Sequence, residues 1–371
     1  MIEIKEKQNC SGCHACYSIC PKNCIKMEKD EEGFAYPVVD KTNCINCGLC
    51  VRSCPILNKK KPEEKILKTY AAINTNEEVR LKSASGGLFS AFADYVLEQG
   101  GVVFGAGFDE KFVVHHQACE TKEDLKKLRM SKYVQSKIGE TFKQAKEYLD
   151  QNRLVYFSGT HCQISGLKNF LRKDYPNLIT QDLICHGVPS PLIWEKYVEY
   201  KSKNYKLKPA NIFFRDKSLG WFLFSIKIDY GKDHKPYRRL CVNDSYMNMF
   251  IHGRILRPSC YTCHFKGEDR ISDITLADFW GGGFKKYAPS MNDKKGCSLV
   301  VAHTHKAEKI LEILEQQNKI KKVLVPTKLA LKGNPMFYKS SKKSVYRKTI
   351  MRKINNVNFK RLAKRYGWII A

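Results

Sequence analysis

The sequence predicts an α+β / α/β protein, in which a small cysteine-rich domain precedes a mixed α/β domain and a basic helical C-terminal tail. Three observations lead to this fold class. They are a duplicated cysteine motif within residues 1–57, alternating strand and helix patterns within residues 69–305, and a basic stretch in residues 306–371. With 371 residues and 43% hydrophobic content, the chain can bury a core well beyond its first domain. We expect residues 58–68, which are charged and contain proline, to form a linker.

The N-terminal segment contains one cysteine motif twice. Each copy has three cysteines separated by two residues and a fourth after three more residues, directly before proline. This is the ligand spacing of a bacterial-type ferredoxin domain with two 4Fe-4S clusters, in which the fourth cysteine of each copy binds the other cluster. Zinc ribbons also use paired CxxC motifs, but not this repeated spacing. The expected ligand sets are Cys10, Cys13, Cys16 with Cys54, and Cys44, Cys47, Cys50 with Cys20.

The remaining N-terminal thiol and the overall cysteine content bear on redox chemistry. Cys24 lies outside both sets, and we interpret it as a spare buried thiol, with a ligand role as the less favoured alternative. At least eight of the sixteen cysteines would bind iron and must stay reduced, which predicts a reducing and anaerobic cytoplasm. The sequence has no run of 18 apolar residues and no hydrophobic signal region before the first motif, in agreement with a cytoplasmic protein.

The central segment alternates between strand and helix patterns. Residues 83–87 (SASGG) precede a helical apolar pattern from Leu88 to Leu97, which ends at Gly100 and Gly101. Glycines 101, 105 and 107 bracket a strand and therefore do not form a dinucleotide-binding fingerprint. The alternation predicts an α/β domain with mixed strand order. The expected strands are 102–108, 112–118, 154–157, 178–184, 222–230, 235–240, 274–277 and 298–302, and the further expected helices are 138–149, 164–171 and 306–317.

Four later cysteines form a second constellation. Cys162 and Cys185 each follow a predicted strand, and Cys260-x2-Cys263 lies in a turn that contains proline and tyrosine. Parallel neighbouring strands end at one edge of a sheet, so these thiols can meet there. Four thiolates suit a third cluster and a structural zinc ion equally well. A Cys–His nucleophile pair at His161-Cys162 or Cys185-His186 is a weaker alternative, because catalytic pairs are usually neighbours in space only.

Six segments between about Thr69 and His305 resemble the beta subunits of coenzyme F420 hydrogenases and dehydrogenases and their bacterial and plant relatives. They are SASGGLFSAFADYVLEQG (83–100), MSKYVQS (130–136), GTHCQISGLK (159–168), ICHGVPS (184–190), CYTCHF (260–265) and ADFWGG (277–282). Members of this family carry FAD and a 4Fe-4S cluster in this domain, and many have a fused ferredoxin domain. The resemblance therefore implies a mixed α/β FAD-binding domain. It also implies that Cys162, Cys185, Cys260 and Cys263 are ligands of a third cluster, with zinc as the less favoured metal.

The resemblance also implies a set of flavin contacts. Ser85, Gly86 and Gly87 would meet the pyrophosphate at a helix start, where free N–H groups and the dipole favour an anion, although capping alone would explain the serine. The further expected contacts are Lys132, Tyr133, Gln135, Ser158, Gly159, Thr160, Asp278, Gly281 and Gly282, with turn capping as the alternative role of the aspartate. His161 and His186 are candidates for protonating a substrate or a flavin nitrogen. A hydrogen bond around the cluster is the alternative for either histidine.

The formal net charge is +28, and much of it lies at the C-terminus. Residues 319–371 contain 16 Lys or Arg and no Asp or Glu. Such a tail could attract an acidic redox partner, an anionic membrane surface or nucleic acid, and a solvated basic face is the alternative. Apolar side chains within the tail predict helix faces that pack on another part of the protein. They are Ile350, Ile354, Val357, Leu362 and Ile369.

Together, these features predict an iron-sulfur flavoprotein oxidoreductase. A flavin exchanges electrons in pairs or singly, so FAD belongs between a two-electron substrate and one-electron clusters. The expected partner is a ferredoxin or another acidic redox protein, and the expected substrate is an unidentified small molecule. One alternative is an electron-transfer subunit without a substrate site of its own. A third, less favoured, is an iron-sulfur protein that acts on nucleic acid through its basic tail.

Overall fold

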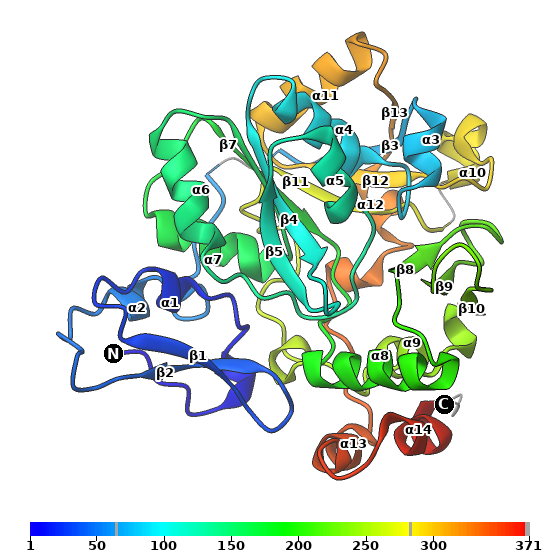
Figure 1. Cartoon of the computed structure of the whole chain (residues 1–371). Helices are drawn as coiled ribbons and strands as arrows, with labels where there is room; N and C mark the ends of the chain where they lie inside the picture. The colour runs from blue at the N-terminus through cyan, green and yellow to red at the C-terminus, as the bar shows by residue number, and fades with distance from the viewer. Residues whose placement is uncertain (64–65, 282–283, 368–371) are drawn as a thin grey trace.

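The structure, a computed structural model, describes residues 1–63, 66–281 and 284–367 of the chain. A small N-terminal domain lies beside a large α/β domain, and the last helices lie below the large domain in the view of Figure 1. The mixed α/β architecture confirms the expected fold class. Within these described ranges, none of the helices combines the length and the apolar character that a membrane span requires.

The N-terminal domain is built from two short helices and one hairpin. Helices α1 (Ala15–Ser18) and α2 (Leu49–Arg52) each carry the third cysteine of a motif. Each begins after a residue in the left-handed region, His14 (φ 64°) or Gly48 (φ 72°), which turns the cysteine loop into the helix. Strands β1 (Ile25–Lys29) and β2 (Ala35–Val39) pair antiparallel. The small core consists largely of cysteine and isoleucine side chains.

The large domain contains an eight-stranded sheet with the order β13-β3-β12-β11-β7-β6-β4-β5. Its strands are β3 (Lys68–Asn74), β4 (Val102–Phe108), β5 (Val114–Cys119), β6 (Val155–Ser158), β7 (Leu178–Leu183), β11 (Ile274–Asp278), β12 (Ser298–Ala302) and β13 (Ile320–Leu324). Strands β4, β6, β7 and β11 run parallel, and the others pair antiparallel, so the predicted mixed strand order is confirmed. The carboxyl ends of the four parallel strands therefore meet at one edge of the sheet.

Helices cover both faces of this sheet. Helices α4 (Leu88–Leu97), α5 (Lys122–Leu128) and α11 (His305–Gln316) pack on one face. On the opposite face, α6 (Thr141–Asp150) and α7 (His161–Leu171) cover β4, β6 and β7. The short helices α10 (Phe284–Tyr287) and α12 (Thr327–Leu331) cover the part of that face near β3 and β12. One further short helix, α3 (Glu77–Leu81), follows β3.

A smaller antiparallel sheet and the tail share a second large core. The sheet contains β8 (Asn211–Asp216), β9 (Ser225–Asp229) and β10 (Tyr237–Leu240), and it packs with α8 (Pro191–Tyr205) and α9 (Ser245–Ile251). The tail helices α13 (Arg347–Lys353) and α14 (Phe359–Leu362) bury Ile350, Ile354 and Leu362 in the same core, with Val357 partly buried. The tail thus packs through the expected apolar faces, whereas Ile369 lies outside the described residues.

Two boundaries expected from the sequence need correction or qualification. The large domain does not end at residue 305, because β13 pairs with β3 and forms an edge of the large sheet. In the expected linker, Lys68 already belongs to β3, and residues 64–65 lie outside the described residues. The elements α8, α9, β3, β8 and β13 were also not expected from the sequence.

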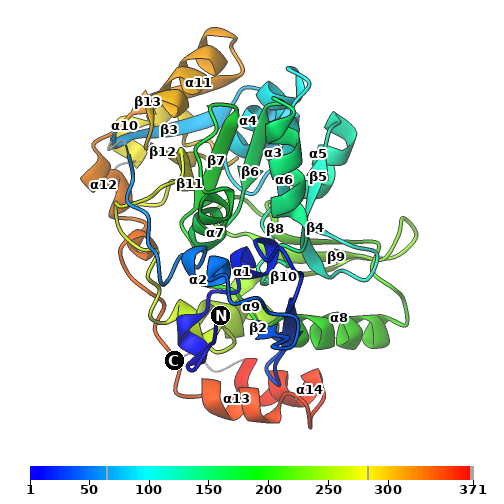
Figure 2. The same ribbon diagram turned by 90° about the vertical axis from the view of Figure 1, so that its left-hand side faces the viewer.

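The N-terminal domain packs directly on the large domain. Figure 2 shows α1 and α2 next to α7, and α1 contacts α7. At this contact, a methyl group added to Gly166 would lie 2.9 Å from Cys13 Cβ and 3.0 Å from Cys13 Sγ. Gly166 therefore lets α7 approach the first cysteine motif.

We expect Gly166→Ala to lower the free energy of unfolding by about 1–3 kcal/mol, because the added methyl group overpacks the contact with Cys13. Thermal unfolding of the anaerobically purified protein measures this loss. Gly105→Ala is the matched control, since its added methyl group would meet nothing closer than 3.5 Å. Equal melting temperatures for the two variants would contradict the tight contact.

Candidate functional site

The eight N-terminal cysteines line two cavities. The first cysteine cavity is lined by Cys10, Cys13, Cys16 and Cys54. The second cysteine cavity is lined by Cys20, Cys44, Cys47 and Cys50. Each cavity thus gathers three cysteines of one motif and the fourth of the other, as the ferredoxin spacing predicts. Cys24 also lies in the second cavity, with its Sγ 3.3 Å from Cys20 Sγ.

A fully buried arginine holds the loop of the first cysteine cavity. The Arg257 side chain is 0% exposed, and its Nε donates to the carbonyl of Cys10 at 2.7 Å. One terminal nitrogen lies 3.5 Å from Cys10 Sγ and donates to the carbonyl of Ala35 at 3.0 Å. The other donates to Gln135 Oε1 at 3.0 Å, and Gln135 in turn donates to the carbonyl of Ser11. This guanidinium therefore joins the large domain to both the cysteine loop and the hairpin.

The four later cysteines line one further cavity, the third cysteine cavity. Cys162 lies in the first turn of α7 after β6, and Cys185 follows β7. The amide of Gly187 donates to Cys185 Sγ at 3.2 Å, and the amide of Val188 lies 3.4 Å from Cys260 Sγ. Burial raises the pKa of the Cys260 thiol to about 12. Such a thiol becomes a thiolate when a metal supplies the compensating positive charge.

The donor set of the third cysteine cavity suits a metal cluster. It consists of four thiols, Cys162, Cys185, Cys260 and Cys263, with backbone N–H groups directed at two of the sulfurs. In the described part of the chain, no three His, Cys, Asp or Glu side chains converge closely enough to hold a single metal ion. Each thiolate of a cubane binds a different iron atom, and four thiolates also suit one zinc ion.

A large cavity of about 620 Å³ lies at the carboxyl edge of the parallel strands. Its lining includes Ala106 of β4, Ser158 of β6, Leu183 of β7 and Asp278 of β11. Ligands of open α/β sheets bind at this edge, and the volume is typical of cofactor sites. The expected flavin contacts Ser85, Gly87, Lys132, Tyr133, Ser158, Gly159, Thr160 and Asp278 all line this cavity.

The polar lining of the large cavity contains groups that lack a partner within the protein. Among the described residues, the buried atoms Ser90 Oγ, Arg129 Nε and Arg215 Nε line it without a hydrogen-bond partner. The start of α4 at Gly87 (φ 87°) also faces the cavity, and its free N–H groups favour an anion. Burial lowers the pKa of Lys132 to about 7. These groups fit a ligand that is large, carries negative charge and accepts hydrogen bonds, as FAD does.

Three expected flavin contacts have other positions. Gly86 lies between β3 and β12, where a methyl group would come within 2.6 Å of their backbone atoms, and its amide donates to Ser298 Oγ. Gln135 does not line the large cavity but bonds to the loop of the first cysteine cavity. Gly281 (φ 103°) packs against Gly333 of the tail. A fourth expected contact, Gly282, lies outside the described residues.

The two candidate histidines differ in position. His161 lines only the third cysteine cavity, with Nδ1 3.0 Å from the carbonyl of Phe265. His186 lines both the third cysteine cavity and the large cavity, and its Nε2 lies 3.0 Å from the carbonyl of Ile251. Burial lowers the pKa of His161 to about 4 and that of His186 below its usual value. His186 is thus the one of the two that borders the large cavity.

Several residues of the large cavity are not predicted from the sequence. Arg215 is buried, donates to Asp278 Oδ1 at 2.8 Å and lies over the ring of Phe224. His116 is held between Ser136 Oγ and the carbonyl of Ser158. The others are Trp280, which lies within the quoted ADFWGG segment, Ser298, and Asn334 from the tail. A single residue of these types does not belong to a recognisable motif. Only Trp280 lies in one of the segments that resemble the family.

The third cysteine cavity adjoins the cavities on either side of it. It shares Ser11 and Ile56 with the first cysteine cavity. It shares Thr160, Cys185 and His186, among others, with the large cavity. The first and second cysteine cavities lie together in the small N-terminal core. The four cavities therefore form one row through the protein.

Two family models match parts of this chain. Residues 9–57 match the model of the 4Fe-4S dicluster domain. Residues 152–326 match the model for the C terminus of the beta subunit in the coenzyme F420 hydrogenase/dehydrogenase family. This part of the chain is thus similar to that family. Both matches confirm the resemblance drawn from the sequence motifs, and they show an iron-sulfur protein of an oxidoreductase family.

One solved structure and the curated proteins complete the comparison. The fold is similar to a chain of the F420-reducing NiFe hydrogenase complex from Methanosarcina barkeri, studied as a xenon derivative. The two chains are 16% identical, the match covers 79% of this chain and 93% of that one, and the TM-score is 0.49. No curated protein matches this chain.

We expect Arg257→Met to shift the midpoint potential of one N-terminal cluster to a more negative value. The positive charge of Arg257 and its hydrogen bond beside Cys10 both stabilise the reduced cluster. The substitution removes both of them. A redox titration followed by electron paramagnetic resonance measures the shift, and Arg257→Lys should recover part of it because the charge remains.

Arg347→Met is the control for this prediction. Arg347 is also buried, and it pairs with Glu32 at 2.5 Å without contacting a cysteine. Unchanged potentials in Arg257→Met, with a thermal destabilisation like that of Arg347→Met, would show that Arg257 has only a structural role.

Proposed function

We propose that the protein is an iron-sulfur flavoprotein oxidoreductase. In this proposal the first and second cysteine cavities hold the two clusters of the dicluster domain, the third cysteine cavity holds a third 4Fe-4S cluster, and the large cavity holds FAD. The observation that carries the proposal is the row of four adjoining cavities, because the third cysteine cavity shares lining residues with both of its neighbours.

The residues that would hold each group follow from the cavity linings. Cys162, Cys185, Cys260 and Cys263 would bind the third cluster, with the amides of Gly187 and Val188 bonded to its sulfur ligands. The start of α4 together with Arg129 and Arg215 would meet the negatively charged part of FAD. When bound, FAD exchanges electron pairs with an organic substrate and single electrons with 4Fe-4S clusters.

The chain itself supplies positioning, charge and shielding around the large cavity. Leu88, Phe89 and Phe250 provide apolar walls that exclude water. An anion beside Lys132 would favour the charged form of this lysine and raise its lowered pKa. His186 borders both the third cysteine cavity and the large cavity, so its imidazole is the candidate to hold a proton there.

The substrate and the direction of electron flow are separate questions. We propose a small organic molecule that gains or loses two electrons at the large cavity. Coenzyme F420 is the first compound to test, because the matched family is named for it. A protein that exchanges electrons with its partner but with no small molecule would instead be an electron-transfer subunit, which is the alternative function.

Anaerobically purified protein should contain about 12 iron atoms and one FAD per chain. We expect Cys263→Ser to lose about four iron atoms, keep FAD, and reduce that FAD far more slowly when reduced methyl viologen is added. Metal analysis, the visible flavin spectrum and stopped-flow absorbance measure these three quantities.

Cys119→Ser is the matched control, since Cys119 is a buried thiol that lines none of the four cavities. It should keep the iron content and the rate of FAD reduction of the wild type. Protein with about 8 iron atoms and one zinc, or without FAD, would refute the proposed function.

A further inference from the structure

The second cysteine cavity opens on a face of the N-terminal domain that we call the Cys47 face. It is formed by Met1, Lys22, Ile45, Asn46 and Cys47, which all line this cavity. All twelve candidate ligand cysteines belong to the described residues, and of these Cys47 alone is exposed. The Cys47 face is therefore where a bound cluster would lie nearest to the solvent.

The Cys47 face combines an apolar centre with a basic surrounding. Ile45 is 58% exposed and Met1 is 46% exposed. Residues 41–62 contain five Lys or Arg and no Asp or Glu, and residues 10–27 contain two lysines and no acidic residue. An apolar centre inside a charged rim is the usual composition of a protein interface.

Three acidic residues of the N-terminal domain, Asp30, Glu31 and Glu32, lie at the hairpin turn between β1 and β2. Asp30 and Glu31 pair with Lys7 at 2.7 and 2.6 Å. Glu32 pairs with Arg347 of the tail. These three carboxylates are therefore neutralised by ion pairs, whereas Asp40 accepts hydrogen bonds from Thr42 and Asn43 beside Cys44.

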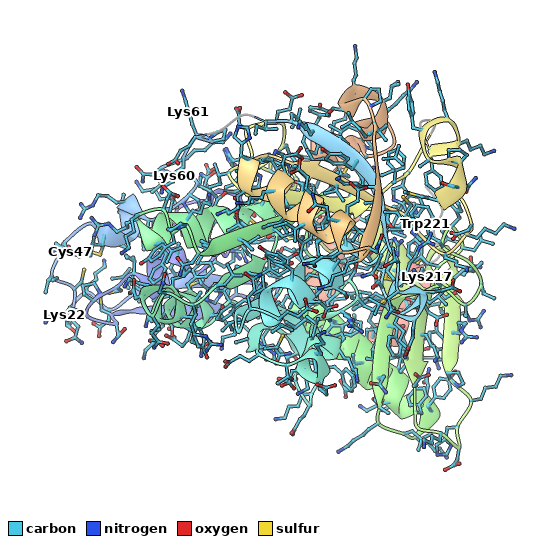
Figure 3. All side chains as sticks on the ribbon, turned by 90° about the horizontal axis from the view of Figure 1, so that it is seen from above. Lys22, Cys47, Lys60, Lys61, Lys217 and Trp221 are labelled. Atoms are coloured by element: carbon cyan, nitrogen blue, oxygen red, sulfur yellow. The ribbon has the colours of Figure 1, made fainter. Side chains whose placement is uncertain are left out.

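The position of the Cys47 face suits electron exchange with a partner. In Figure 3, Cys47 and Lys22 lie together at one end of the molecule, with Lys60 and Lys61 on the same side. Lys217 and Trp221 lie toward the opposite end, and Trp221 stacks on Trp280 of the large cavity. The two ends of the row of cavities thus lie toward different ends of the molecule.

We propose that the Cys47 face is the docking site of an acidic one-electron carrier protein of the ferredoxin type. Complementary charge accelerates and orients such encounters, and the exposed Ile45 and Met1 give the apolar contact. Each encounter moves one electron between the carrier and this chain, so one is oxidised as the other is reduced. This inference rests on the proposed function and identifies its partner. It assigns docking to the Cys47 face and not to the basic tail.

The test measures binding without turnover. Isothermal titration calorimetry at low ionic strength would use the cluster-loaded full chain and a purified acidic two-cluster 4Fe-4S ferredoxin, both oxidised. Lys41 is exposed and stands three residues before Cys44, which lines the same cavity as Lys22. We expect Lys22→Glu with Lys41→Glu to raise Kd by at least about 10-fold and to weaken the dependence of Kd on salt. Ile45→Ser should raise Kd while leaving that salt dependence unchanged.

The matched control reverses two exposed lysines of the tail, Lys348→Glu with Lys364→Glu. We expect its Kd to stay near the wild-type value, and iron content checks that every variant is loaded. A loss of binding in the tail variant equal to or greater than that in the Lys22 and Lys41 variant would overturn the proposal. So would a wild-type chain that does not bind the ferredoxin.

Reduced methyl viologen separates this inference from the proposed function. This small radical cation needs no protein docking site, so it should reduce the bound FAD of the Lys22 and Lys41 variant as fast as that of the wild type. If viologen reduces FAD but the variant binds the ferredoxin normally, only the docking site is wrong. If viologen does not reduce FAD in the wild type, the proposed function is wrong whatever the binding result.

Discussion

The buried guanidinium of Arg257 is the interaction on which the arrangement of the two domains depends. It is fully enclosed and donates to the carbonyls of Cys10 and Ala35 and to the side chain of Gln135. Its own carbonyl accepts from the amide of Cys260, so one residue joins the loops of the first and third cysteine cavities. A buried charge is tolerated only when its donors are satisfied. The Cys10 loop and the hairpin are therefore fixed against the large domain together.

Other contacts also hold the N-terminal domain against the large domain. Gly166 lets α7 approach Cys13, and Arg347 of the tail pairs with Glu32 at the hairpin. The tail also lines the large cavity through Asn334, whose side chain donates to the carbonyl of Asp278. The basic tail is therefore part of the fold, since its apolar faces complete a core and its loop completes a cavity wall. Because the apolar side chains of the tail face the core, many of its lysines and arginines lie at the surface.

The parts of the fold and site that could be predicted are those with a repeated cysteine motif or an alternating pattern of apolar residues. The cysteine spacing separated the two N-terminal sets, and the apolar alternation placed most strands of the large sheet. Apolar alternation does not predict β13, because this strand (IKKVL) is short and half polar. Its partner β3 lies some 250 residues earlier in the chain. Arg215 and Arg257 were also missed, since a single arginine reads as a surface residue until its surroundings bury it. Gln135 stands two residues after Tyr133, yet it bonds to the Cys10 loop while Tyr133 lines the large cavity.

The central claim is that cluster and cofactor sites form one continuous row from the N-terminal domain to the large cavity. Crystals of the anaerobic, loaded protein, measured at the iron and zinc absorption edges, test it most directly. The account predicts three iron peaks, one in each cysteine cavity, and FAD density in the large cavity with its phosphates at the start of α4. A zinc peak among Cys162, Cys185, Cys260 and Cys263, or FAD density elsewhere in the protein, would contradict it.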